Sequence, residues 1–478
     1  MLQSPDRSSR AILIFWLPLA LQWIMMALEG PFLAAVIARL PDPTFNLAAY
    51  GVAFAFAILV ESPVIMLMSA STALVEDARS YRRLRAFANH LNIFSTALLV
   101  LLLIPPVFDL VLRTGLGLPP EVADLVYGSL WILLPWPAAI GYRRFVHGVL
   151  IRSGRTRLVA YGTAVRLGAM ATTGLILAGT GIPGAWVGAG ALSAGVMVEA
   201  VAAWVMSRGA VRELLEGEIG AAALDQPGPL QEPRPGTGTA RALGGAVAAE
   251  EREGEPEGGE EPPDELDYRS ILRFYYPLAL TSLIGLTSQP ILTFFMGRAP
   301  APVESLAVFP VVMALYFIFG TFGLSYQEAA IALVGRKGEH RREVGRFAAG
   351  LSIAASGGMA LIVFTPMARV WFEGISGLEP GLAALAFLPA QIVAVVPALS
   401  VVLGFQRALL VQARRTRPIT VATALEVGSI ALLFPLFGWG LGWMGATSAM
   451  VALAGGRIVG VTFLAWRLGF SGASVEPA

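Results

Sequence analysis

The chain has 478 residues, of which 56% are hydrophobic and only 14% charged, and its mean hydropathy is +0.68. A soluble domain averages about 45–50% apolar and about 25% charged residues, so this composition indicates a protein that crosses a membrane several times. The net charge of +1 gives no sign of a nucleic-acid partner, and the lack of cysteine excludes disulfides, thiolate metal sites and thiol nucleophiles.

The first apolar run predicts a membrane helix rather than a signal peptide. It follows arginines in "MLQSPDRSSRAILIFW" but continues past Ala34. This is longer than the roughly 7–15 apolar residues of a signal peptide, and no small-residue cleavage site interrupts it.

Twelve segments contain the roughly 20 mostly apolar residues that a membrane helix needs. They are residues 11–38, 46–74, 93–113, 123–150, 157–180, 184–207, 270–297, 304–334, 347–371, 380–411, 418–437 and 441–466. Many contain prolines, which membrane helices tolerate where neighbouring groups or a wet cavity satisfy the freed carbonyls. We expect an all-α polytopic membrane protein.

Arginine-rich loops predict the orientation, because basic loops stay in the cytoplasm. The loops "VEDARSYRRLRAF", "IRSGRTR", "GRKGEHRREVGR" and "QARRTR" are basic, whereas the alternate loops are short and nearly uncharged. Both termini should therefore be cytoplasmic. We expect the bacterial inner membrane as the location, from the arginine and alanine bias.

Residues 223–266 differ from the rest of the chain. They are rich in proline and glycine, and residues 250–267 hold ten acids and one arginine. Such a segment cannot bury enough apolar surface to fold. We therefore expect a disordered cytoplasmic linker between an N-terminal six-helix lobe (1–222) and a C-terminal one (267–478).

The two lobes are copies of each other. Pro18-Leu-Ala-Leu matches Pro277-Leu-Ala-Leu at an offset of 259, as do Pro31 with Pro290 and Arg39 with Arg298; "RTR" at 155–157 matches "RTR" at 415–417 at an offset of 260. Because each copy holds six spans, both run in the same direction through the membrane. They should be related by a pseudo-two-fold axis along the membrane normal, with a site between them, as in many transporters.

Three short stretches stand out, namely "AAYG" (48–51), "FYYPLALTSLIGLTSQPILTFFMGR" (274–298) and "GWMGAT" (442–447). They resemble the progressive ankylosis (ANK) transporter family, a MATE-like branch of the multidrug/oligosaccharidyl-lipid/polysaccharide (MOP) superfamily. The resemblance implies a MATE-like fold and export of a small organic or phosphate-bearing anion.

The sequence also departs from that family. Gln289 stands where the family has an arginine, and three other basic positions of the family are Ile58, Ala330 and Gln391 here. If those basic residues hold the anion, this chain holds its substrate differently.

Charged residues inside the predicted spans are costly, so each suggests a function or a buried ion pair. We expect two structural pairs, Arg166 with Glu199 in the first lobe and Glu426 with Arg457 in the second. The apparent reversal of all four signs relative to the ANK pattern favours pairs over substrate ligands.

Three acids have no obvious local partner, namely Glu29, Glu61 and Glu328. Glu29 and Glu61 come just before prolines. Desolvation would let such carboxyls exchange protons near neutral pH, and they could instead bind Na⁺ or a cationic substrate. The alternative is pairing, for instance of Glu61 with Arg143 or Arg144.

Basic and amide side chains complete the candidate set. Arg143, Arg144, His147 and Arg407 could flank an anion or reach the lipid headgroups. Gln289, Gln391 and Gln406 could line a cavity. We expect no metal and no cofactor, with H⁺ or Na⁺ as a possible coupling ion.

The favoured function is a monomeric MOP-type secondary transporter that exports a small anion by rocker-switch alternating access. Its partners would be a small-molecule substrate and the lipid bilayer, without nucleic acid. The lone lysine, Lys337, lies in no phosphate-binding loop, and no histidine-rich metal motif suggests an enzyme. The alternatives are a proton- or sodium-coupled exporter of cationic or amphipathic compounds, a lipid-linked precursor flippase, and a membrane scaffold that signals through the acidic linker.

Overall fold

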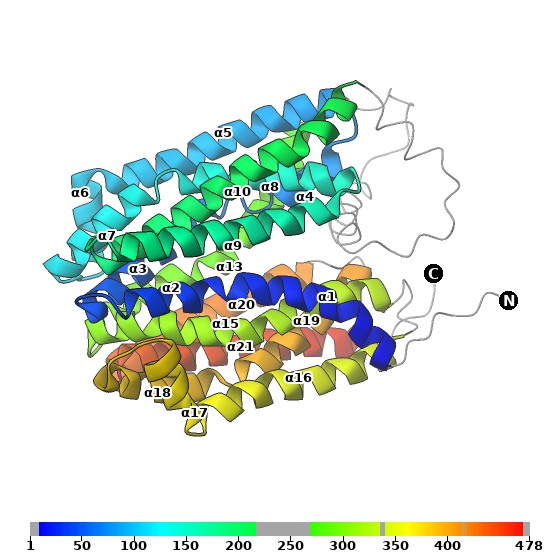
Figure 1. The fold of residues 1–478 in the computed structure, drawn as a ribbon. Helices are drawn as coiled ribbons and strands as arrows, with labels where there is room; N and C mark the ends of the chain where they lie inside the picture. Colours follow the sequence, from blue (N-terminus) through cyan, green and yellow to red (C-terminus); the bar gives the residue numbers. More distant parts are fainter. Residues whose placement is uncertain (1–8, 217–267, 335–339, 414, 416, 472–478) are drawn as a thin grey trace.

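The computed structural model describes residues 9–216, 268–334, 340–413, 415 and 417–471, and within these ranges every regular element is a helix (Figure 1). The predicted linker, 223–266, lies outside the described residues. Each of the twelve predicted segments contains helix. In the described part of the chain, nine helices are long and apolar enough to cross a membrane, and the bent pair Pro120–Ile132 and Trp136–Arg152 is a tenth.

The first repeat contains α1 to α10. Its helices are α1 (Ser9–Ala27), α2 (Glu29–Ile37), α3 (Pro43–Glu61), α4 (Leu67–Leu74), α5 (Ala78–Leu103), α6 (Pro105–Phe108), the π-helix η1 (Asp109–Gly115), α7 (Pro120–Ile132), α8 (Trp136–Arg152), α9 (Thr156–Ala178) and α10 (Gly184–Leu215).

The second repeat has the same order of spans, with one helix, α15, in place of α3 and α4 and an additional π-helix, η3, after its fifth span. Its helices are α13 (Tyr268–Leu286), α14 (Ser288–Met296), α15 (Pro302–Leu333), α16 (Arg341–Val363), α17 (Met367–Arg369), the π-helix η2 (Val370–Ile375), α18 (Pro380–Val393), α19 (Val396–Gln412), α20 (Arg417–Phe434), the π-helix η3 (Pro435–Gly440) and α21 (Gly445–Ser471).

Prolines explain where the spans break. Pro31 and Pro290 lie in the first turns of α2 and α14, and Pro137 and Pro397 lie in the first turns of α8 and α19. Proline removes a backbone donor and clashes with the preceding turn, so it suits the start of a helix and ends the one before it. The first and fourth spans of each repeat are therefore broken at equivalent points.

The second and third spans differ from the predicted segments. The predicted span 46–74 is interrupted after Glu61, next to Pro63, whereas its counterpart α15 is continuous. The third span begins at Ala78 rather than near residue 93, because an Asp77–Ser80 capping box starts α5 before the apolar stretch.

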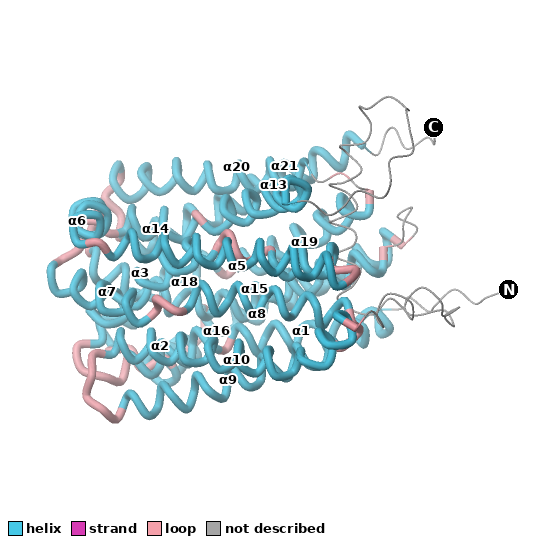
Figure 2. The backbone as a smooth tube through the Cα atoms, turned by 90° about the horizontal axis from the view of Figure 1, so that it is seen from above, coloured by secondary structure: helices cyan, strands magenta, loops and turns pink. Residues whose placement is uncertain are grey.

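The helices form two layers, the upper one mainly from the first repeat and the lower one mainly from the second, and α1 of the first repeat lies along the lower layer (Figure 1). In the upper layer α8 packs against α4 and α10, and α9 packs against α10; in the lower layer α15 packs against α19, and α20 packs against α21. Figure 2 shows that the axes of the long helices are roughly parallel to one another. The fold is thus a two-lobe helical bundle.

The first helix of each repeat contacts the other lobe: α1 packs on α15 and α16, and α13 contacts α5 as well as α20 of its own repeat. Trp16 of α1 stacks edge-on against Phe347 of α16 and donates to the Ser325 hydroxyl at 2.9 Å. Tyr275 of α13, 259 residues after Trp16, packs edge-on against Phe87 of α5. Since Phe87 and Phe347 are also equivalent, these two aromatic contacts between the lobes obey the pseudo-two-fold symmetry.

The lobes meet most closely where α3 packs against α15. A Cβ atom placed on Gly51 would lie 3.2 Å from the ring of Pro310, its equivalent in the second repeat. Leu47, Ala48, Leu306 and Val311 are almost fully buried around this point. The pseudo-two-fold axis therefore passes between Gly51 and Pro310.

The two ends of the bundle differ in charge. The arginines of 79–85, 152–157 and 341–346 lie at the start of α5, where α8 ends and α9 begins, and at the start of α16. These helix ends share one end of the bundle, which we call the basic end (Figure 1). The close contact at Gly51 lies in the first half of α3, nearer the opposite end. The lobes are therefore packed together toward the end away from the basic loops.

Candidate functional site

Five helices of the first lobe bring charged side chains together inside the bundle. We call this set the N-lobe cluster, and it consists of Glu29 (α2), Glu61 (α3), Arg143, Arg144 and His147 (α8), Arg166 (α9) and Glu199 (α10). Glu29 begins α2 directly after the break in the first span. The cluster holds three acids and three arginines, so its formal charges balance when His147 is neutral.

Two short ion pairs organise the cluster. Arg166 donates to Glu29 at 2.5 Å, and Arg143 donates to Glu199 at 2.6 Å. Arg166 also approaches Glu199, at 3.9 Å. The expected contact between Arg166 and Glu199 is therefore present only as the longest of the three.

Glu29 has no local partner but pairs with a distant arginine, which is the alternative left open for the three acids. Its carboxylate is the closest partner of Arg166, because α2 packs directly against α9. The sequence alone could not indicate this pair, since 137 residues separate the two side chains.

The remaining members of the cluster interact at longer range. Glu61 is 7% exposed and lies within electrostatic range of Arg144 and Arg143. No ion pair within 4 Å joins Glu61 to either arginine among the described contacts. The imidazole of His147 lies next to Gly162, where an added Cβ would be 3.4 Å from Nε2.

Many polar atoms of the cluster have no hydrogen-bonding partner in the protein. They are one carboxylate oxygen each of Glu29, Glu61 and Glu199, the Nε atoms of Arg143, Arg144 and Arg166, and Nε2 of His147. Asn92 Oδ1, also without a partner, faces Gly141 of the same helix as the arginines. Buried polar atoms normally bond to protein or water, so this cluster is suited to hold water, protons or an ion.

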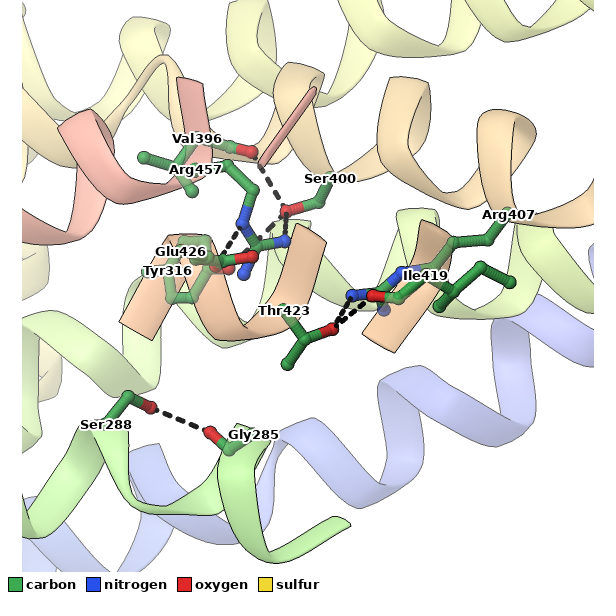
Figure 3. A network of polar contacts seen from close by, with 10 residues as sticks. All are labelled: Gly285, Ser288, Tyr316, Val396, Ser400, Arg407, Ile419, Thr423, Glu426 and Arg457. Carbon is green, nitrogen blue, oxygen red and sulfur yellow. Dashed lines mark hydrogen bonds and ion pairs between the residues drawn. The ribbon is translucent and has the colours of Figure 1, made fainter. Parts of the chain in front are cut away.

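A smaller set of polar side chains lies in the second lobe (Figure 3). Arg457 of α21 donates through Nε to Glu426 of α20 at 2.8 Å and through Nη1 to the Ser400 hydroxyl at 3.1 Å. Tyr316 of α15 reaches the same hydroxyl at 3.4 Å. The expected contact between Glu426 and Arg457 is thus present, and its purely structural role stays a prediction.

Arg407 of α19 has no carboxylate partner among the described contacts. Its Nη2 donates to the Thr423 hydroxyl at 3.2 Å, and its buried Nε has no partner (Figure 3). We call Arg407, Thr423, Glu426 and Arg457 the C-lobe cluster; it holds two arginines for one acid.

The C-lobe cluster faces the break in the seventh span. The methyl group of Thr423 would lie 3.8 Å from a Cβ atom on Gly285, at the end of α13. Ser288, the equivalent of Glu29, begins α14 just beyond this break and donates to the Gly285 carbonyl at 3.0 Å (Figure 3). Arg407 therefore lies near the same part of its repeat as the charges around Glu29.

Among the described contacts, no hydrogen bond or ion pair joins the other predicted residues to either cluster. Gln391 donates to the Val363 carbonyl at 3.1 Å, and Gln406 donates to the Val461 carbonyl at 3.1 Å, so both bridge neighbouring helices. Gln289 is half-buried in the first turn of α14. Glu328 is hydrogen-bonded to Trp23 of α1.

Sequence reasoning missed the hydroxyl and amide groups that complete the clusters. Asn92, Tyr316, Ser400 and Thr423 carry no charge, and such residues occur in many membrane helices for packing reasons. The one available signal was position, since Ser400 and Thr423 lie one helical turn or two from Arg407 and Glu426.

No protein-family model matches the chain, and no curated protein matches it. The similarity to solved structures is broad. An inward-facing conformation of a multidrug resistance MATE family transporter of the MOP superfamily has 14% identity and a TM-score of 0.66, covering 97% of this chain and 99% of that one. An outward-facing conformation of such a transporter has 17% identity and a TM-score of 0.58, covering 98% and 97%.

The lipid II flippase MurJ, in an inward closed conformation, is similar to the same extent. It has 13% identity and a TM-score of 0.68, covering 95% of this chain and 87% of that one. The chain therefore has the MATE-like fold of the MOP superfamily along nearly its whole length. At these identities the likeness concerns the fold and leaves the ANK branch a prediction.

Proposed function

We propose that the chain is a MOP-type secondary transporter that exports a small organic or phosphate-bearing anion across the bacterial inner membrane by alternating access. The basic end would be cytoplasmic, following the positive-inside rule. The transporters and the flippase that share the fold support transport as the general activity.

The observation that favours an anion is the state of Arg407. A guanidinium inside a membrane protein is costly unless something neutralises it, and here its one protein partner among the described contacts is a hydroxyl. Its Nε is free to donate, and planar guanidinium groups bind carboxylate and phosphate oxygens well. A transported anion would supply the missing charge.

Conformation supports the alternating-access part of the proposal. The contact of Gly51 with Pro310 closes the bundle toward the end away from the basic loops. The TM-score is higher with the inward-facing MATE conformation than with the outward-facing one, 0.66 against 0.58. Both fit a state closed on the extracytoplasmic side.

Uptake into liposomes tests the proposal. We would measure transport of citrate, pyrophosphate and ATP beside a cationic dye, with wild type, Arg407→Gln and the surface control Arg113→Gln. We expect anion uptake in wild type and the control and at least a tenfold loss in Arg407→Gln, the equivalent of about 1.4 kcal/mol of lost binding. Transport of the dye alone, or anion uptake unchanged in Arg407→Gln, would contradict the anion assignment.

The N-lobe cluster favours a second candidate, a proton- or sodium-coupled exporter of cationic compounds. Its buried acids Glu29 and Glu61 each keep one oxygen without a protein partner, which suits proton exchange or Na⁺ binding. In this case a pH or Na⁺ gradient should drive dye efflux, and Glu29→Gln or Glu61→Gln should abolish it. A gradient-independent anion flux would exclude this candidate.

A further inference from the structure

Two arginines occupy the same point of each repeat at the end opposite the basic loops. Arg39 comes two residues after α2, and Arg298 comes two residues after α14. Both precede a tight turn in which a non-glycine residue, Asp42 or Ala301, has a φ of 51°. The repeated strained turn fixes where each arginine leaves its helix.

Arg39 reaches from the first repeat to the second. Its Nη2 donates to the carbonyls of Gly374 at 2.6 Å and Ile375 at 2.9 Å, at the end of η2. Its Nη1 donates to the Ala35 carbonyl at 2.7 Å, within its own helix. The final carbonyls of a helix carry partial negative charge, so a cation bound to them joins the two lobes favourably.

Arg298 makes the reciprocal contact. Its Nη2 donates to the Thr114 carbonyl of η1 at 2.9 Å, and its guanidinium lies over the Phe294 ring at 4.4 Å. Thr114 and Gly374 are equivalent at the offset of 260. Each lobe therefore offers an arginine to the π-helix of the other.

A glycine with positive φ lies beside each arginine, where a side chain would crowd the guanidinium or its stem. Gly377 has a φ of 73°, and a Cβ atom there would lie 2.7 Å from Arg39 Nη1. Its equivalent, Gly117, has a φ of 69°, and a Cβ atom there would lie 4.0 Å from Arg298 Cγ. The closer contact is that of Gly377 with Arg39, which also makes more hydrogen bonds than Arg298.

We propose that Arg39 and Arg298 form a two-fold latch that holds the extracytoplasmic ends of the lobes together and must open in each transport cycle. This proposal rests on the alternating-access function proposed above. Both arginines are exposed and bind neutral carbonyls, so water can replace these contacts when the lobes separate. Such contacts bias a two-state equilibrium without locking it.

Distances between spin labels test the latch directly. The chain has no cysteine, so Thr180→Cys and Gly440→Cys, at equivalent exposed positions after the fifth spans, can be labelled without removing native thiols. Ser153→Cys with Ala413→Cys reports on the basic end. In nanodiscs, Arg39→Gln should raise the ratio of open to closed extracytoplasmic ends on the order of tenfold, and Arg298→Gln should raise it less.

Two further variants keep the test decisive. Gly377→Ala should displace the Arg39 guanidinium and reproduce the shift, even if Arg39→Gln does not insert. Arg113→Gln removes an arginine from the same end, but its partners Asp109 and Asp124 belong to its own lobe, so the distances should stay as in wild type. Unchanged distances in Arg39→Gln, Arg298→Gln and Gly377→Ala would refute the latch.

The readout also separates the two proposals. A shift at the extracytoplasmic pair without any measurable anion transport would support the latch and contradict the proposed cargo. Anion transport with no shift in any latch variant would do the reverse.

Discussion

The two lobes carry their buried charges in opposite ways. In the N-lobe cluster three acids face three arginines, and the short pairs Arg166–Glu29 and Arg143–Glu199 neutralise most of the charge. In the C-lobe cluster Glu426 pairs with Arg457, and Arg407 is left with a hydroxyl. The two copies thus have nearly the same backbone but different charge balance.

Equivalent positions make this contrast sharper. Arg166 in the first repeat corresponds to Glu426 in the second, and His147 corresponds to Arg407, both at the offset of 260. The proline breaks and the helix packing are kept, whereas the sign of the buried charge is not. The fold is therefore set by features that both copies share, and chemistry by features that they do not.

The largest effect should come from breaking a balanced pair in the first lobe. Arg166→Ala leaves Glu29 buried without its cation and should cost about 3–5 kcal/mol of stability. The double swap Arg166→Glu with Glu29→Arg should recover most of it. Thermal unfolding in detergent, followed by the intrinsic fluorescence of the ten tryptophans, measures both variants.

The choice of partner is the control for this prediction. From the sequence, the restoring swap would be Arg166→Glu with Glu199→Arg. In the structure that swap puts the new glutamate beside Glu29 and the new arginine beside Arg143, so it should stay as unstable as the single change. Rescue by the Glu199 swap would show that the observed pairing is wrong.

Neutralising the unbalanced arginine should have a much smaller effect on stability. Arg407→Gln removes a buried charge without leaving a buried carboxylate, so the cost should be below about 1 kcal/mol. Arg457→Gln is the matched comparison, because it isolates Glu426 and should behave like Arg166→Ala. Equal melting temperatures for Arg407→Gln and Arg457→Gln would contradict the claim that Arg407 lacks a buried carboxylate partner whereas Arg457 has one.

The sequence predicted the scaffold better than the site. Apolar runs located the helices, and the offsets of 259 and 260 identified the repeats. Prolines such as Pro290 and Pro397 marked the breaks, because their effect on a helix is local. Apolar runs and prolines act on the helix in which they lie, and the repeat is read by comparing the sequence with itself, so neither needs knowledge of the packing.

Pairing and lobe exchange depend on contacts between distant segments. Glu29 and Glu199 both lie near Arg166, and only the packing of α2 on α9 decides which one is closer. Likewise, nothing near Trp16 in sequence indicates that it packs on Ser325 and Phe347 of the other lobe. The equivalence of Arg39 and Arg298 was visible in the sequence, but their carbonyl partners were not.

The smallest expected difference between the lobes concerns the helix starts at the basic end. α5 begins with the Asp77–Ser80 capping box, whereas its counterpart α16 begins after His340 without a side-chain cap. Asp77→Ala should therefore lower the free energy of unfolding by about 1 kcal/mol. The second lobe has no side-chain cap at the equivalent helix start, so it has no corresponding contribution to lose. Thermal unfolding of Asp77→Ala beside wild type at pH 7 measures this difference.

The pH dependence identifies the cause of this loss. Hydrogen bonds from the Ser80 backbone and side chain lower the pKa of Asp77 below its ordinary value of 3.8. A lowered carboxyl pKa stabilises the fold above the ordinary pKa and loses that contribution as the pH falls through the folded-state value. The gap between wild type and Asp77→Ala should thus be constant from pH 7 to 5 and shrink below about pH 4. If the difference in stability between wild type and Asp77→Ala persists at the lowest pH, the loss comes from packing and not from the charged cap.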